Sequence, residues 1–78
     1  DNSFAEEVNR LHPSLTKNDL RMIYLIRLNL SSKEISSLLN ISIRATEQAR
    51  YRLKKRLGLS NEIDLATYIL NLRKPKDK

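Results

Sequence analysis

The middle of the chain has the hydrophobic and polar pattern of two helices joined by a short turn. Ser31 and Glu34 have the spacing of a capping box, which predicts a helix that continues to about Leu39. Asn40 suits the left-handed residue that ends a helix, and Ser42 can cap the next helix. Because the turn is so short, we expect the two helices to cross, as in a helix-turn-helix. The apolar side of the first helix is expected to bury three residues: Ile35, Leu38 and Leu39.

The second predicted helix, about residues 43–57, has a narrow apolar side and a broad polar side. At roughly 100° per residue, small or apolar residues gather on one side; they are Thr46, Ala49, Leu53 and Leu57. The opposite side carries long polar side chains and one aromatic ring, from Arg44, Glu47, Gln48, Tyr51, Arg52 and Lys55. Such a side suits the base edges and phosphates of a DNA major groove. The alternative interpretation is a solvated basic helix face.

Four short motifs lie along the chain: Leu15-Thr16, Leu30-Ser31-Ser32-Lys33-Glu34-Ile35, Ile41-Ser42 and Leu53-x-x-x-Leu57-Gly58-Leu59. Over roughly residues 15–70 they resemble the LuxR-type (GerE-type) DNA-binding domain of bacterial transcription regulators. The resemblance implies a small four-helix domain whose third helix enters the major groove and whose fourth can dimerise. It also implies a cytoplasmic, bacterial protein. The fourth region of a sigma factor shares the helix-turn-helix, but the leucine-glycine motif and the helix after it favour the LuxR type.

The predicted recognition helix departs from the family pattern, which usually reads threonine-valine-lysine-x-histidine. The corresponding positions are Ala45, Thr46, Glu47, Gln48 and Ala49. An acid therefore replaces the family's usual DNA-contacting lysine, and Asn29 stands where the family commonly has glycine. The resemblance implies the family's fold and activity, but not its usual target sequence.

Two groups of side chains are candidates for contacts with double-stranded DNA. The base-reading candidates are Arg44, Glu47, Gln48, Tyr51 and Arg52, and the phosphate candidates are Lys33, Arg50, Lys54, Lys55 and Arg56. Gln48 can pair with an adenine edge, and Arg44 or Arg52 with guanine. Glu47 either accepts a hydrogen bond from a cytosine amino group or pairs with a neighbouring cation. Lys33 either reaches a phosphate or is simply exposed.

The first part of the chain predicts two further helices. Phe4, Val8 and Leu11 have helical spacing, and Pro13 ends that stretch. We interpret residues 1–13 as an N-terminal helix or linker that connects to an upstream sensor or signalling domain.

A second helix is predicted to start at Thr16, with Asp19 completing a capping box, and to end near Asn29. Tyr24 is expected to be a core residue. The chain's single histidine, His12, is expected to be structural, because no carboxylate or cysteine set surrounds it in the sequence.

After Gly58 the pattern predicts a last helix, capped by Ser60 or Asn61. Three of its residues are expected to face the core: Ile63, Ala66 and Leu70. The remaining apolar residues would form a second stripe and are the dimerisation candidates: Leu65, Tyr68, Ile69 and Leu72. The alternative is one broad stripe packed wholly on the N-terminal helix. The main domain is thus predicted to span residues 14–72, followed by a disordered basic tail, residues 73–78.

Composition narrows the fold and the classes of function. Seventy-eight residues, 40% hydrophobic and 31% charged, predict one folded soluble domain with a modest core. One glycine and two prolines favour an all-α fold with short loops. The chain has no cysteine to ligate zinc and no apolar run of membrane-spanning length, and we expect no membrane contact by this segment. Without a glycine-rich phosphate loop or a nucleophile–base pair, we expect no enzyme, cofactor or metal.

The net charge of +6 is distributed unevenly along the chain. Residues 1–41 are neutral, residues 42–59 carry +5, residues 60–72 carry −2 and residues 73–78 carry +3. A polyanionic partner explains why the charge gathers on the predicted recognition helix. The alternative function is a protein-interaction or dimerisation module, which uses the last helix and has only non-specific affinity for polyanions.

Overall fold

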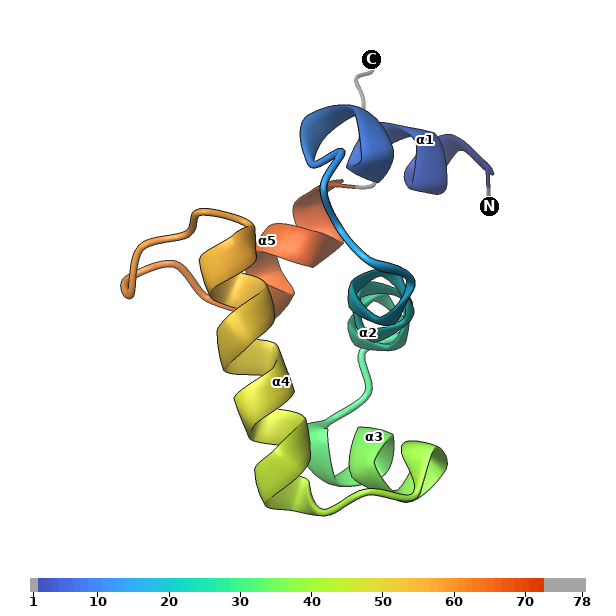
Figure 1. Ribbon diagram of the computed structural model, residues 1–78, viewed down its shortest axis with the longest axis vertical. Coiled ribbons are helices and arrows are strands. Elements are labelled where there is room, and N and C mark those ends of the chain that lie inside the picture. The colour runs from blue at the N-terminus through green and yellow to red at the C-terminus, as the bar shows by residue number, and fades with distance from the viewer. Residues whose placement is uncertain (1, 73–78) are drawn as a thin grey trace.

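The computed structural model describes residues 2–72, which form five α-helices and no β-strand (Figure 1). The helices are α1 (Asn2–Leu11), α2 (Lys17–Arg27), α3 (Ser32–Leu39), α4 (Ile43–Arg56) and α5 (Leu65–Leu72). The predicted all-α class is confirmed. Across residues 2–72, none of the helices has both the length and the apolar character that crossing a membrane requires. The predicted basic tail lies outside the described residues.

Reciprocal hydrogen bonds fix the starts of α2 and α3. The Thr16 hydroxyl accepts from the Asp19 N–H at 3.1 Å, and the Asp19 carboxylate accepts from the Thr16 N–H at 3.0 Å. Ser31 and Glu34 make the same pair of bonds at 3.1 and 2.8 Å. Each box satisfies two backbone N–H groups that the helix itself leaves open. Both predicted capping boxes are confirmed.

Three left-handed residues end the middle helices. Asn29 has φ 67° and follows α2, Asn40 has φ 60° and ends α3, and Gly58 has φ 77° and follows α4. Asparagine and glycine tolerate this conformation better than other residues. Directly after Asn40, the Ser42 hydroxyl accepts from the Ala45 N–H at 2.9 Å and caps α4. The short predicted turn between α3 and α4 is therefore present.

A single hydrophobic core draws residues from all five helices. Its buried members are Phe4, Val8, Met22, Ile23, Ile26, Ile35, Leu53, Leu57, Leu65 and Ile69. α1 and α5 lie at one end of the molecule and α3 and the start of α4 at the other, with α2 between α1 and α3 (Figure 1). The Phe4 ring packs against Tyr24 with ring centroids 5.7 Å apart, and the Arg27 guanidinium covers it at 4.1 Å. α1 is therefore part of this core, and the boundary predicted after Pro13 does not separate two cores.

The start of α5 differs from the prediction. The helix begins at Leu65, and its cap is Asp64, whose carboxylate accepts from the N–H and the hydroxyl of Thr67, both at 3.0 Å. The backbone bond from Thr67 is the main cause that lowers the pKa of Asp64. The Ser60 hydroxyl, one of the two predicted caps, lies instead 3.2 Å from the Glu62 carboxylate. The predicted cap at Ser60 or Asn61 is therefore wrong.

This later start changes which residues of α5 face the core. Leu65 is 5% exposed and Ile69 is fully buried, whereas Ile63 precedes the helix and is 42% exposed. The assignment of Leu65 and Ile69 to an outward dimerisation stripe is therefore wrong, and so is the inward assignment of Ile63. Tyr68 and Leu72, the other two dimerisation candidates, are half-buried. The apolar side of α5 packs against α1 and α2.

The linker between α1 and α2 is fastened to α5 by one side-chain contact. The Nε2 atom of His12 lies 2.9 Å from the hydroxyl of Tyr68, and the two rings meet edge to face. Partial burial raises the pKa of Tyr68. His12 thus makes a structural contact, as its sequence context predicts.

Candidate nucleic-acid interface

The inner side of α4 anchors the helix in the core. Thr46, Leu53 and Leu57 are at most 6% exposed, and Ala49 is half-buried. The Thr46 hydroxyl donates to the Ser42 carbonyl at 3.1 Å, so its polar atom is satisfied inside the core. The predicted inner side is confirmed, and its small residues let α3 pack against the N-terminal half of α4.

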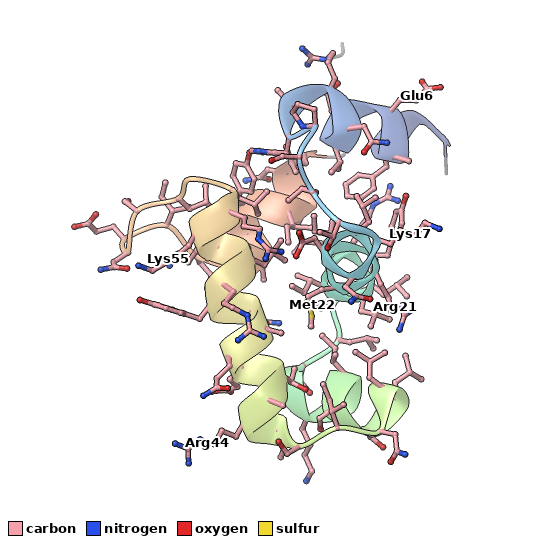
Figure 2. The ribbon with its side chains drawn as sticks, viewed as in Figure 1. Glu6, Lys17, Arg21, Met22, Arg44 and Lys55 are labelled. Carbon is pink, nitrogen blue, oxygen red and sulfur yellow. The ribbon has the colours of Figure 1, made fainter. Side chains whose placement is uncertain are left out.

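The outer side of α4 is free of the core along its whole length. All five base-reading candidates are exposed: Arg44, Glu47, Gln48, Tyr51 and Arg52. Figure 2 shows Arg44 near the start of α4 and Lys55 near its end, both pointing away from α2. The candidates that sequence spacing places on one side therefore share one exposed surface, which we call the outer face of α4.

Two residues of the outer face have distinct local environments. Tyr51 is 57% exposed, and the Lys55 ammonium lies 5.2 Å from the centre of its ring, within the range of a cation–π contact. Glu47 takes part in neither of the two ion pairs found within residues 2–72. The salt bridge considered for Glu47 is therefore absent from the described structure, and its carboxylate stays open as an acceptor.

Arg56, a predicted phosphate contact, is instead committed to α2. Its Nη1 atom donates to both carboxylate oxygens of Asp19, at 2.7 and 2.8 Å. Burial raises the pKa of Asp19, but hydrogen bonds from the Thr16 N–H and from Arg56 outweigh burial, so the pKa ends below its ordinary value. The pair joins the start of α2 to the end of α4. The assignment of Arg56 to phosphate is therefore a poor fit to the structure.

The other phosphate candidates differ in how freely they project. Lys33 and Lys55 are exposed, whereas Arg50 and Lys54 are half-buried. The Lys54 ammonium also donates to the Asn61 carbonyl at 3.2 Å, which ties it to the loop before α5. Lys33 and Lys55 are thus the cations best placed to meet a phosphate.

A shallow depression of about 630 Å³ continues the outer face beyond the end of α4. It is lined by two lysines, a tyrosine and the loop that leads to α5, namely Tyr51, Lys54, Lys55, Gly58, Leu59, Ser60, Asn61 and Glu62. Sequence reasoning missed the loop as part of this surface. The only signal in the sequence was the pair Lys54 and Lys55, one turn before the helix-ending Gly58.

Apolar side chains are exposed around the turn between α3 and α4. Ile41 is 41% exposed, Ile43 is 47% exposed and Leu38 is 64% exposed. The prediction that Leu38 is buried is wrong, because the side of α3 that meets the rest of the fold carries Ile35, Ser36 and Leu39. Ile43 directly precedes Arg44, so an apolar contact lies beside the first base-reading candidate.

Metal-ligating groups do not gather anywhere in the described part of the chain. Between residues 2 and 72, no cluster of three or more histidine, cysteine, aspartate or glutamate side chains could hold a metal ion. Comparisons of the chain with protein-family models, with curated proteins and with solved structures found no match.

Proposed function

We propose that this domain binds double-stranded DNA, with the outer face of α4 in the major groove. The observation that carries the proposal is the division of α4 into two sides. Its inner side is buried, whereas the outer side exposes two arginines, an amide, a carboxylate and a phenol. A helix of this kind can enter the major groove and present several donors and acceptors to base edges.

Each outer-face side chain matches a chemical group of the groove. The Gln48 amide can donate to and accept from an adenine edge, and an Arg44 guanidinium can donate twice to guanine. Glu47, which no cation neutralises in the described structure, can accept from a cytosine amino group. The exposed side chain of Ile43 suits a thymine methyl group.

The charge distribution supports the same partner. Residues 42–59 carry a net charge of +5, while residues 1–41 are neutral. Lys33 and Lys55 project from the helices on both sides of the α3–α4 turn and suit phosphate contacts. The resemblance to LuxR-type domains supports this proposal and adds a biological role, the output domain of a bacterial transcription regulator.

Selection from a random duplex library at near-physiological salt tests the proposal. We expect the domain to enrich a reproducible motif, and Gln48→Ala to blur that motif at one position, at a cost of about 1–3 kcal/mol in binding. Asn9→Ala is the matched control, because it removes the same amide group from an exposed site on α1. The control should leave the motif unchanged.

Two outcomes of the selection contradict the proposal. If nothing is enriched and binding vanishes as salt rises, α4 offers only a basic surface to polyanions. The domain would then be a protein-interaction module. If a motif is enriched but Gln48→Ala and Asn9→Ala affect it alike, α4 is not the reading helix.

A further inference from the structure

A groove of about 520 Å³ separates α2 from α4 on the flank of the molecule next to the outer face. Four of the side chains that line it are apolar, and we call them its floor: Met22, Leu39, Ile41 and Ala49. The other lining residues are polar or charged, and we call them its rim: Thr16, Asn18, Asp19, Arg21, Arg52 and Arg56. Figure 2 shows Met22 directed from α2 into the space beside α4. The volume of the groove falls within the ordinary range of ligand sites.

Two arginines that line this groove, one from each helix, carry unneutralised positive charge. Arg21 belongs to α2 and Arg52 to α4, and both are exposed. Neither guanidinium has an ion-pair or hydrogen-bond partner among the described residues. The one carboxylate on the rim, Asp19, is already satisfied by Arg56 and by the Thr16 N–H. The groove thus presents two free cations above an apolar floor.

This combination distinguishes the groove from a phosphate site. Phosphates are held by converging N–H and cationic donors, whereas the floor here offers methyl and thioether groups. A ligand of this groove must therefore have apolar side chains that pack on the floor and hydrogen-bond acceptors for the guanidinium groups of Arg21 and Arg52. Arginine binds carboxylate with two parallel hydrogen bonds, so carboxylates fit the two arginines.

We propose that the groove between α2 and α4 binds an acidic amphipathic segment of a partner protein. One or two large apolar side chains of the segment pack on Met22, Ile41 and Ala49. Glutamate or aspartate residues on either side of them pair with Arg21 and Arg52. Recognition of this kind uses an apolar stripe for affinity and flanking charges for orientation. The groove shares Arg52 with the outer face of α4, but the proposal does not rest on DNA binding by that face.

Selection of random 12-residue peptides displayed on phage tests the proposal. We expect the domain to enrich peptides that place a large apolar residue between acidic residues. A synthetic peptide of the enriched sequence should bind the Arg21→Glu variant about tenfold more weakly than the parent. The reason is that a glutamate, which repels the acidic residues of the peptide, replaces one of the two arginines. Arg44→Glu is the matched control, because it makes the same change of net charge outside the groove. Circular dichroism should show equal helix content in both variants.

The location of the peptide can be read from a single signal. Met22 is the chain's only methionine, so a ¹³C-methyl-methionine sample gives one resonance, on the floor of the groove. Binding of the enriched peptide should shift that resonance. Ile41→Ser should weaken binding of the peptide but leave the domain folded, because Ile41 is 41% exposed.

Three results would overturn the proposal. The first is a selection that yields no peptides, or peptides without acidic residues. The second is an equal loss of peptide affinity in Arg21→Glu and Arg44→Glu, which would indicate only general attraction of an acidic peptide to a basic domain. The third is a Met22 methyl resonance that random duplex DNA shifts and the peptide does not, which would assign the groove to nucleic acid.

Discussion

Single residues with left-handed backbone mark where the middle helices stop. Asn29, Asn40 and Gly58 all have φ between 60° and 77°. A β-carbon placed on Gly58 would meet nothing within 4 Å. Any cost of a side chain at this position therefore comes from the backbone conformation and not from a clash.

We predict that Gly58→Ala lowers the free energy of unfolding by about 1 kcal/mol, because alanine is strained at positive φ. Gly58→Asn should cost less than half as much, since asparagine tolerates this conformation, as Asn29 and Asn40 do in the same chain. Urea unfolding of the three proteins measures the difference. Equal losses for the two substitutions would show that the site is limited by packing.

The residues that the sequence predicts correctly are those whose role is local. The caps Thr16, Ser31 and Ser42, and the left-handed Asn40, depend on neighbours within a few positions. Leu38 was predicted to be buried and is 64% exposed, because burial depends on which side of α3 meets the rest of the fold. Helical spacing alone does not contain that information.

At the scale of elements, the same distinction separates α4 from α5. The two sides of α4 were predicted correctly, because its polar and apolar residues are cleanly divided. α5 is apolar on more than one side, so its orientation depends on where it begins. The true cap, Asp64, lies beyond the two predicted caps, and this later start places Leu65 and Ile69 in the core.

The pairing of Asp19 with Arg56 also lay beyond sequence reasoning. The two residues are 37 positions apart, and their meeting depends on how α2 and α4 pack. Its charge and its place on a helical wheel predict that Arg56 contacts phosphate. The structure makes it instead a tie between two helices whose relative position sets the outer face and the groove.

This tie predicts how stability depends on pH. The pKa of Asp19 is lowered in the folded protein, so the unfolded chain binds the proton more readily as the pH falls. The stabilisation is therefore complete above the carboxyl's ordinary pKa and is lost as the pH falls through the lower, folded value. Asp19→Asn should be less stable than the parent by about 1–2 kcal/mol at pH 7, and the gap should narrow below about pH 4.

Arg56→Met separates the two contributions of Asp19, because it removes the ion pair and leaves the capping box with Thr16 intact. Arg56→Met should lower the free energy of unfolding at pH 7 by less than Asp19→Asn does, by about 0.5–1 kcal/mol, since the Arg56 side chain is 50% exposed. Thermal unfolding across the pH range measures both variants. A gap between Asp19→Asn and the parent that does not change with pH would contradict this account.

At the scale of the whole molecule, the basic charge is not uniformly available. Arg56 is paired and Lys54 is bonded to the Asn61 carbonyl, whereas Lys33 and Lys55 are exposed. Counting positive charges in the sequence therefore overstates the number that can meet phosphates. The proposed DNA complex should involve fewer phosphate contacts than the net charge suggests.

The salt dependence of DNA binding tests this difference. We predict that Lys33→Ala weakens binding to all duplexes alike and reduces the slope of log K against log salt by about 1. Arg56→Gln should leave the slope unchanged, because its guanidinium is already paired. Lys17→Ala is the control, since Figure 2 shows Lys17 on the side of α2 away from α4. A larger change of slope for Arg56→Gln than for Lys33→Ala would contradict the assignment.

The two terminal helices of the described chain lie at the same end of the molecule. α1 packs against α5, and both occupy one end of the molecule, while the turn between α3 and α4 occupies the other (Figure 1). A tether or fluorescent label attached near the start of α1 or the end of α5 would thus sit far from the start of α4. The domain is well suited to oriented display on a sensor surface, where a single anchoring point leaves both the outer face and the groove open to ligands.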